Sequence, residues 1–369
     1  MSVYNGSSYL EETMESIVNQ TFTDFEFIII EDCSTDNSPE IIANYANKDK
    51  RIIIVKNEEN IGLTKSLNKG LKLAKGDYIA RQDADDVSLP SRLEKEVLLL
   101  ENNPEIGLVS CSFDVIDSQG NRIGEHKRLK SNPDLVSWYL LFHNHIGGHS
   151  QVMFRKKLAI ELGGYDENRR YSQDYELWSR LMLVSKIAIL PDFLLKRRKH
   201  SESISVSKSS EQKNYSLTQS KHNIEQLIGK KISLEEAKHF RDFWFGHYRD
   251  KRFPEIKYIA EINSRLLEIY QVFIQKENIK SDFSRKLRIL IGKQFHYWIQ
   301  QPLTIEQSLV SKFKISYYAF TWHWSEKPVI WQILLIPVRW VILFLNTLLA
   351  VFKLILQPLY YKEKLATNK

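Results

Sequence analysis

Cysteine is scarce in this chain, and the glycine loops that bind phosphate are missing from it. Among 369 residues there are two cysteines, Cys33 and Cys111, which excludes a disulfide framework or a thiolate metal site and fits a reducing compartment. The 14 glycines form neither G-x-G-x-x-G nor G-x-x-x-x-G-K-[ST], whose backbone amides cradle phosphate. A phosphorylated ligand would therefore be held mainly by a metal ion and basic side chains.

The composition predicts a folded, basic protein. Hydrophobic residues make up 43% and charged residues 26% of the chain, enough for a proper core. The opening stretch, MSVYNGSSYLEE, has no charged and apolar leader, so we expect no secretory signal. The net charge of +7 favours an anionic partner, which could be nucleic acid, a phosphorylated substrate or a membrane surface.

Strand and helix patterns alternate in the first half of the chain. Short β-rich runs at 25–30, 51–55 and 77–82 are separated by helical patterns at 39–48 and 63–76. This alternation predicts βαβ units and an α/β fold with a mostly parallel sheet. Ligands bind beyond the carboxyl ends of the strands in such sheets.

Two clusters of carboxylates follow predicted strands, EDCSTD at 31–36 and DADD at 83–86. Three mutually repelling carboxylates at a ligand-binding edge indicate a cation, and oxygen ligands suit Mg²⁺ or Mn²⁺, which would also bridge a diphosphate. A calcium loop of the EF-hand type is excluded by Ser88 at its glycine position and by Pro90. The alternative is that one aspartate merely begins the helix predicted at 89–101, but that role needs one carboxylate, not three.

The second half of the chain differs in composition. The serine-rich basic stretch 196–231 predicts a mobile segment, and Ser233 with Glu236 predicts a capping box before a helical region that extends to about 300. Residues 329–352 are mainly apolar and long enough to cross a membrane, but they contain proline and arginine, and their polar residues form one stripe. We therefore expect an interfacial helix, with a helix of the protein core as the alternative.

Six stretches, taken in order, resemble the family-2 glycosyltransferases with the GT-A fold. The nucleotide-binding half is matched by SVYNGSSYLEETMESIVNQTFTDFEFIIIEDCSTDNS and NIGLTKSLNKGLKLAKGDYIARQDADD. The acceptor half is matched by HSQVMFRK, GGYDE, SQDYELWSRL and KRRKHSESIS. The resemblance covers roughly residues 1–205.

The resemblance implies a role for each matching residue. Asp32 would accept a hydrogen bond from the nucleotide base, and Asp174 would be the catalytic base. The metal would be held by Asp85 or Asp86 together with His200. The remaining residues of the expected nucleotide-sugar site are Tyr4, Asn5, Lys65, Asp83 and Arg198.

Each of these roles has a plainer alternative. Asp32 could cap the turn that follows it, Asp174 could cap the helix running to about 184, and a histidine in a basic run is more often solvated than bound. Gln173 stands where the family commonly has an acidic residue. The apolar strand that the family carries before SVYNG is mostly missing, so we expect either that the natural start lies upstream or that this end is frayed.

The expected organisation has three parts. Residues 1–205 would form the glycosyltransferase domain, with the nucleotide-binding half at 1–110 and the acceptor half at 111–205. Residues 206–326 would form a basic linker and helical accessory region, and 327–369 a membrane-associating segment.

Together these observations predict an inverting, metal-dependent glycosyltransferase. It would move a sugar from a nucleotide-diphosphate donor, most simply a UDP-sugar, to a saccharide or lipid-linked acceptor at the cytoplasmic face of a bacterial membrane, in surface polysaccharide synthesis. No nucleic-acid partner is expected. The alternatives are a sugar-nucleotide pyrophosphorylase, which would need a glycine-rich loop that NGSSYL does not supply, and a non-catalytic basic module for membranes or nucleic acid, which would not need the aspartates.

Overall fold

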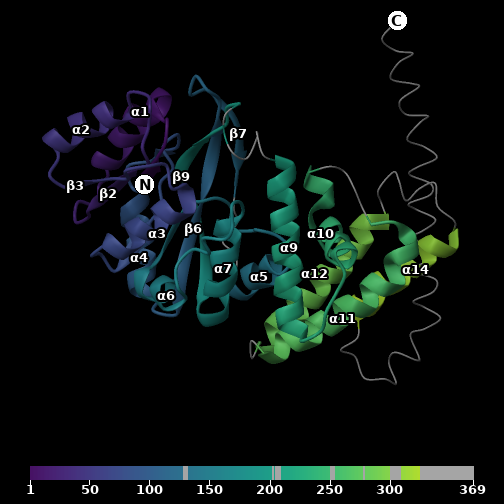
Figure 1. Cartoon of the computed structure of the whole chain (residues 1–369). Helices are drawn as coiled ribbons and strands as arrows, with labels where there is room; N and C mark the ends of the chain where they lie inside the picture. Colours follow the sequence, from purple (N-terminus) through teal and green to yellow (C-terminus); the bar gives the residue numbers. More distant parts are fainter. Residues whose placement is uncertain are drawn as a thin grey trace, which may run out of the picture. The chain divides into compact units, whose positions relative to one another are not determined.

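The computed structural model describes residues 1–127, 132–201, 203, 209–249, 254–276, 279–299 and 309–324. The chain divides into two compact units, Met1–Arg241 and Asp242–Lys369 (Figure 1). The first unit therefore extends past residue 205, the boundary expected from the sequence.

The first sheet of this unit is small and parallel. Its order is β1-β2-β3, and its three strands alternate with helices as the hydrophobic pattern predicts. The helices bury Leu10, Met14 and Ile42 completely in the core beside it. Strands and helices alternate here in the order β1 (Ser2–Val3), α1 (Ser7–Val18), β2 (Phe27–Glu31), α2 (Ser38–Lys48), β3 (Ile52–Lys56) and α3 (Leu63–Leu73).

The second sheet is mixed, which corrects the expectation of a mostly parallel fold. Its order is β4-β8-β6-β9-β5, with β7 paired to β6, and of these pairs only β6–β9 is parallel. The central strand β6 is buried along nearly its whole length. Its own sequence therefore lacks the alternation of apolar and polar residues that marks a half-exposed strand. The strands of the second sheet are β4 (Tyr78–Ala80), β5 (Val87–Ser88), β6 (Ile106–Ile116), β7 (Arg122–His126), β8 (Val152–Arg155) and β9 (Lys186–Arg198).

The basic stretch 196–231, expected to be mobile, contains the end of β9 and the helix α9 (Ser209–Ile228). The inner face of α9 is largely polar: Asn223 Nδ2 donates to Leu140 O at 2.9 Å, and Ser220 Oγ donates to Leu141 O at 3.0 Å. Polar side chains thus make contacts that apolar side chains make in most buried helix faces. For this reason the sequence of α9 is as polar as that of a linker. The other helices of the unit are α4 (Arg92–Asn102), α5 (Pro133–Leu140), α6 (Lys156–Glu161) and α7 (Gln173–Val184).

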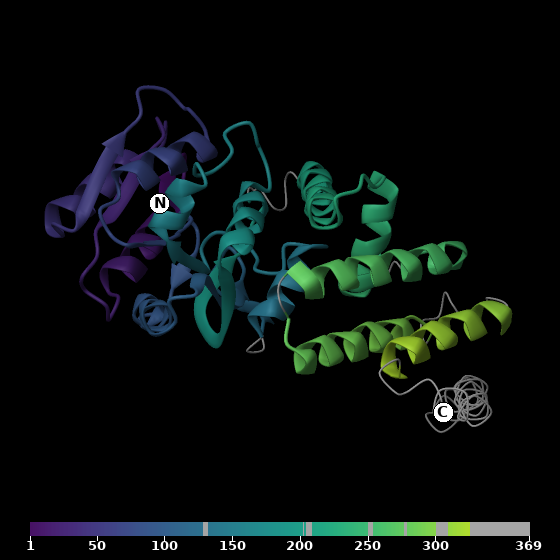
Figure 2. The ribbon, with the colours of Figure 1, turned by 90° about the horizontal axis from the view of Figure 1, so that it is seen from below.

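The second unit is helical. The capping box is confirmed at the start of α10 (Leu234–Arg249), just before the division between units: Ser233 N donates to Glu236 Oε2, and Glu236 N donates to Ser233 Oγ. Helices α12 and α14 lie side by side (Figure 2). The elements after α10 are η1 (Ile256–Tyr258), α11 (Ile259–Lys276), α12 (Ser281–Ile299) and α14 (Leu309–Trp324).

No helix in the described part of the chain has both the length and the hydropathy needed to cross a membrane. The apolar stretch 329–352 lies outside the described residues.

Candidate functional site

Asp32 follows β2 and ties down the loop that leads into α3. Its carboxylate accepts hydrogen bonds from Asn57 Nδ2 at 2.7 Å, Ile61 N at 3.0 Å and Gly62 N at 2.9 Å. A carboxylate has about four acceptor positions, and these bonds use three of them in a side chain that is 1% exposed. These bonds go to the loop before α3 rather than to the turn that follows Asp32, so the plainer role differs from the cap expected, and contact with a nucleotide base stays a prediction.

The turn after β1 is fixed to the turn after β2. Asn5 has a left-handed backbone with φ of 50°, and its Oδ1 accepts from Thr35 N at 2.8 Å. Its own backbone amide donates to Ser34 Oγ at 3.1 Å. These bonds hold Tyr4 at the surface with 52% of its area exposed, which leaves its ring free to stack on a planar ligand.

Lys65 lies in the first turn of α3 with an exposed side chain. One helical turn later, Lys69 Nζ donates to Asn57 Oδ1 at 2.7 Å, in the same loop that Asp32 holds. Lys65 therefore remains available to a ligand, while Lys69 supports the loop.

The DADD aspartates point in different directions. Asp83 Oδ1 forms an ion pair with Arg81 at 3.2 Å, and its backbone amide donates to Ser150 Oγ at 3.0 Å. Asp85 Oδ2 lies 3.0 Å from His200 Nε2. The structure thus brings together Asp85 and His200, two of the residues expected to bind metal.

Asp86 is turned into the protein instead. It is 4% exposed, and its Oδ1 accepts the backbone amide of Arg198 at 2.8 Å. Burial and then the charges of Asp85 and Asp83 raise the pKa of Asp86 to about 8. Of the two aspartates left open by the sequence, Asp85 is the one that faces His200.

The charges of the cluster are not equivalent. Burial, followed by the charge of Asp83, raises the pKa of Asp85 in spite of His200. Burial would also raise the pKa of Asp83, but nearby His149 and Arg81 outweigh it and lower that pKa. A cation or a cationic ligand at Asp85 would relieve the repulsion.

The guanidinium of Arg198 is bound to backbone oxygens and to Glu12 rather than to the aspartate carboxylates. Its guanidinium donates to Asp85 O, Asp117 O and the carboxylate of Glu12, and it lies 4.6 Å from the centre of the Tyr9 ring. It is 4% exposed, so it has little capacity for a phosphate group.

The neighbouring Arg197 is a second cation that acts on the cluster, after Arg81. Its charge contributes to the lowered pKa of Asp83 and of His149, and it opposes the rise in the pKa of Asp86. Adjacent side chains on a strand point to opposite faces, so only one of two successive arginines on β9 can point toward the aspartates. The sequence alone does not show which of the two arginines points toward the aspartates.

The segment 144–151 connects the aspartates to Asp174, which lies in the first turn of α7. Asn144 Nδ2 donates to Asp174 Oδ2 at 3.0 Å, while Ser150 accepts the amide of Asp83 at 3.0 Å. Asp83 and Asp174 are therefore positioned by the two ends of one short segment.

His149, in the same segment, feels the charges of both Asp83 and Asp174. It is 8% exposed, and its Nε2 has no hydrogen-bond partner among the described residues. Burial, followed by the charge of Arg81, lowers its pKa. Its ring packs between Tyr165 and Trp178.

Four residues of the site were missed in the sequence: Arg81, Asn144, His149 and Arg197. Arg81, His149 and Arg197 lie inside motifs that resemble the family, which is the one signal that could have found them.

The residues fit a divalent cation incompletely. Within the ranges that the structure describes, no three His, Cys, Asp or Glu residues are grouped to hold a metal. Asp85 and His200 supply an oxygen and a nitrogen 3.0 Å apart, so further ligands would have to come from the substrate or solvent.

Comparison with known proteins identifies the family. Residues 1–163 match the model of glycosyl transferase family 2. An uncharacterised glycosyltransferase of Methanocaldococcus jannaschii is 42% identical over 219 residues, covering 58% of this chain and 75% of the relative. The amylovoran biosynthesis glycosyltransferase AmsE of Erwinia amylovora is 33% identical over 207 residues, covering 55% of this chain and 76% of AmsE.

A solved structure with a similar fold is TarS 1–349 of S. aureus in complex with UDP-GlcNAc. It has a TM-score of 0.52 and 16% identity, and the match covers 87% of this chain and 88% of TarS 1–349. At that identity the likeness concerns the fold alone, which is the GT-A α/β fold of glycosyltransferases. On the sequence relatives and this fold together, the chain belongs to glycosyltransferase family 2.

Proposed function

We propose that the chain transfers a sugar, with inversion, from a nucleotide-diphosphate donor to a hydroxyl group of a saccharide or lipid-linked acceptor. The observation that carries this proposal is that one short segment, 144–151, is bonded to both aspartates: Asn144 Nδ2 donates to Asp174 Oδ2 and Ser150 Oγ accepts the amide of Asp83. One carboxylate follows a strand at the ligand-binding edge, and the other begins a helix of the acceptor half. A donor sugar and an acceptor hydroxyl would meet between them.

In this mechanism Asp174 takes the proton of the acceptor hydroxyl as that oxygen attacks the anomeric carbon. Asn144 holds the carboxylate by a 3.0 Å hydrogen bond, so the base is aimed before the acceptor binds. Attack on the face opposite the leaving diphosphate inverts the anomeric carbon, and no covalent intermediate with the enzyme is required.

The nucleotide would lie across the ends of β2 and β4. Asp32 accepts a donor group of the base, and Tyr4 offers an exposed ring to it. The base is most simply uracil. Asp83 lies toward the ribose, and Arg197 and Lys65 supply positive charge for the diphosphate.

Asp85 and His200 are the residues that would hold Mg²⁺ or Mn²⁺. Such an ion neutralises charge that develops on a leaving diphosphate. Asp86 is not among its ligands, because its carboxylate is buried against the amide of Arg198.

The acceptor is proposed to belong to a surface polysaccharide. The support is the relative AmsE, whose name assigns it to the biosynthesis of amylovoran. The apolar stretch 329–352 would bring the enzyme to the cytoplasmic face of the membrane, where lipid-linked acceptors are found.

Asp174→Asn tests the proposal. The variant keeps the shape of the side chain but cannot take a proton, so sugar transfer should fall by about 10²-fold or more while calorimetry finds donor binding unchanged. Glu161→Gln, an exposed change on α6, is the control and should retain activity. Full activity of Asp174→Asn would remove Asp174 as the base.

A further inference from the structure

The turn that carries Asp83, Asp85 and Asp86 is held through its backbone. All four carbonyl oxygens of residues 83–86 accept hydrogen bonds from side chains that lie outside the turn. The bonds run from Gln82 Nε2 to Asp83 O (3.2 Å) and Asp86 O (2.7 Å), from Thr13 Oγ1 to Ala84 O and Asp86 O (3.0 Å each), and from Arg198 Nε to Asp85 O (3.0 Å). The shape of the turn, and with it the position of each carboxylate, therefore depends on these side chains.

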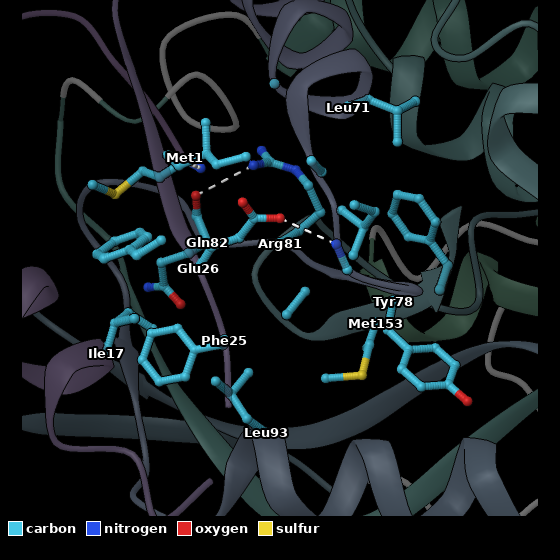
Figure 3. A pocket seen from close by; sticks show the side chains of 18 of the residues that line it. Met1, Ile17, Phe25, Glu26, Leu71, Tyr78, Arg81, Gln82, Leu93 and Met153 are labelled. Atoms are coloured by element: carbon cyan, nitrogen blue, oxygen red, sulfur yellow. Dashed lines mark hydrogen bonds between the residues drawn. The ribbon is translucent and has the colours of Figure 1, made fainter. Parts of the chain in front are cut away.

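Gln82 is the side chain that spans the turn, because its one amide nitrogen binds the first and the last residue. It follows β4 directly after Arg81, and Figure 3 shows these two side chains pointing apart. Arg81 forms the ion pair with Asp83, whereas Gln82 is 3% exposed and so has no access to a ligand. Gln82 thus acts on the aspartates from inside the protein.

The orientation of the Gln82 amide is fixed from its other side. Its Oε1 accepts from Ser88 Oγ at 2.8 Å and from Arg92 Nη1 at 3.0 Å. A guanidinium can only donate, so the amide oxygen must face Arg92 and the amide nitrogen must face the turn. Rotation of the amide by half a turn would place donor against donor on one side and acceptor against acceptor on the other. Arg92 therefore determines which end of the amide meets the turn.

Arg92 is 0% exposed at the start of α4, and each nitrogen of its guanidinium has an acceptor. Nη2 donates to Arg81 O at 2.9 Å and to Val152 O at 3.2 Å, which ties the end of β4 to β8. Nε lies 3.3 Å from Glu96 Oε2, one helical turn along α4. The guanidinium is thus joined to the turn by Gln82 and by the residue before it.

A purely stabilising role explains the buried ion pair poorly. Burial raises the pKa of Glu96 to about 7 although the charge of Arg92 opposes the rise, so a charged carboxylate is costly in this place. Apolar residues of similar volume often give equal or better stability than a buried ion pair. The other contacts of Arg92 lead mainly to the turn, through Gln82, Ser88 and Arg81 O.

We propose that Gln82 and Arg92 are positioning residues of the donor site, which act on Asp83 and Asp85 through the backbone of the turn. Gln82 sets the distance between the first and last residues of the turn, and Arg92 sets the orientation of Gln82. This inference rests on the proposed function, because it takes Asp83 and Asp85 to bind the nucleotide and its metal ion. A looser turn would let these two like charges move apart, and ligand binding would then have to order them.

Gln82→Glu tests the proposal, with Gln20→Glu as its matched control. In Gln82→Glu one oxygen keeps the contact with Arg92, while the other loses both bonds to the turn and faces two carbonyl oxygens. Gln20 is 4% exposed, and its Nε2 also donates to two carbonyl oxygens, those of Ser16 and Leu89. The two substitutions therefore remove the same number of buried bonds, but only Gln82→Glu removes them from the turn.

The measurements are Tm, hydrogen exchange at the amides of residues 84–86 in the ligand-free protein, and the calorimetric Kd of UDP and of GDP with Mn²⁺. Both variants should lower Tm. Only Gln82→Glu should speed the exchange at 84–86 and raise the Kd of the nucleotide that the wild type binds, each by about 10-fold or more. If the wild type binds neither nucleotide, the proposed donor is wrong, and the exchange alone decides whether Gln82 positions the turn. Unchanged exchange or an unchanged Kd in Gln82→Glu would overturn the proposal, as would equal changes in Gln20→Glu.

The double variant Arg92→Met, Glu96→Met separates positioning from stability. Apolar residues replace the ion pair, so the protein should keep a cooperative thermal transition. The amide of Gln82 is then no longer oriented, so exchange at 84–86 should be faster and the Kd higher, as in Gln82→Glu. Wild-type exchange at 84–86 in the double variant would show that Arg92 does not position the turn.

Discussion

Asn144 is a positioning residue that holds both the proposed base and the loop. Its Nδ2 donates to Asp174 Oδ2 at 3.0 Å and to Gly147 O at 2.9 Å, and its Oδ1 accepts the amide of Gly147 at 3.1 Å. Replacing it by alanine removes all three bonds. Replacing it by aspartate keeps an acceptor for the amide of Gly147, loses the two bonds from Nδ2 and puts a negative charge beside Asp174.

We expect Asn144→Asp to lower kcat by about 10- to 100-fold, because a charge-assisted hydrogen bond is replaced by repulsion. Tm should fall less than in Asn144→Ala, since the loop keeps the bond from the amide of Gly147 although it loses the bond to Gly147 O. Asn144→Ala should lower both kcat and Tm. The measurement is steady-state kinetics with thermal unfolding, and Asn102→Ala on an exposed helix end is the control. Wild-type kcat in Asn144→Asp would exclude this role.

Single residues were predictable where the sequence clusters them. Asp83, Asp85 and Asp86 were found because three carboxylates in four positions have few structural explanations. Arg197 on β9 was not found from the sequence. The pairing of β6 with β9 shifts register near Cys111 and Ser112, and such irregularities decide which arginine faces the site. Asn144 and His149 carry no spacing signal, since their partners are distant in the chain.

The segment 144–151 depends on one glycine. Gly147 has φ of +101°, a conformation that is strained for other residues, and a Cβ there would lie 1.9 Å from Gln151 Nε2. Gln151 is 1% exposed and donates to Ile146 O, so it has little room to move. The shape of the segment, and with it the position of Asn144, requires glycine at this point.

Gly147→Ala should therefore lower Tm by about 5 °C or more and reduce transfer activity together with it. Gly148→Ala is a matched control, because a Cβ at Gly148 would be 3.9 Å from its nearest neighbour, Gln151 Oε1. Thermal unfolding and kinetics of the two variants make the comparison. Similar stability in both would show that the segment tolerates a side chain at 147.

At the scale of elements, the sequence predicted what amphipathic patterns reveal. β2, β3, α2 and α3 lie close to the expected runs because one face of each is apolar. The second sheet was predicted less well, because strands buried on both faces, such as β6, show no alternation and do not reveal their direction. The helix α9 was missed because its inner face is polar.

At the scale of the whole molecule, the order of motifs predicted the family, but the separation of the strands into two sheets could not be predicted. Strand patterns do not show which strands pair. The division at Arg241 was likewise hidden, since it falls within α10 rather than in a linker.

The proposed association with membranes is also a property of the whole chain. Residues 329–352 are mainly apolar, with Lys327, Lys353 and further lysines on either side, a composition that binds anionic bilayers through apolar burial and charge. The full chain should sediment with vesicles that contain anionic lipid, and a chain ending at Trp324 should stay in the supernatant. A chain ending at Tyr361 keeps the apolar stretch and should still sediment, which excludes an effect of the last residues. If the stretch belongs to the core instead, the chain ending at Trp324 should lose its cooperative thermal transition. Unchanged sedimentation of that chain would refute the proposal, because the remaining residues would then suffice for binding.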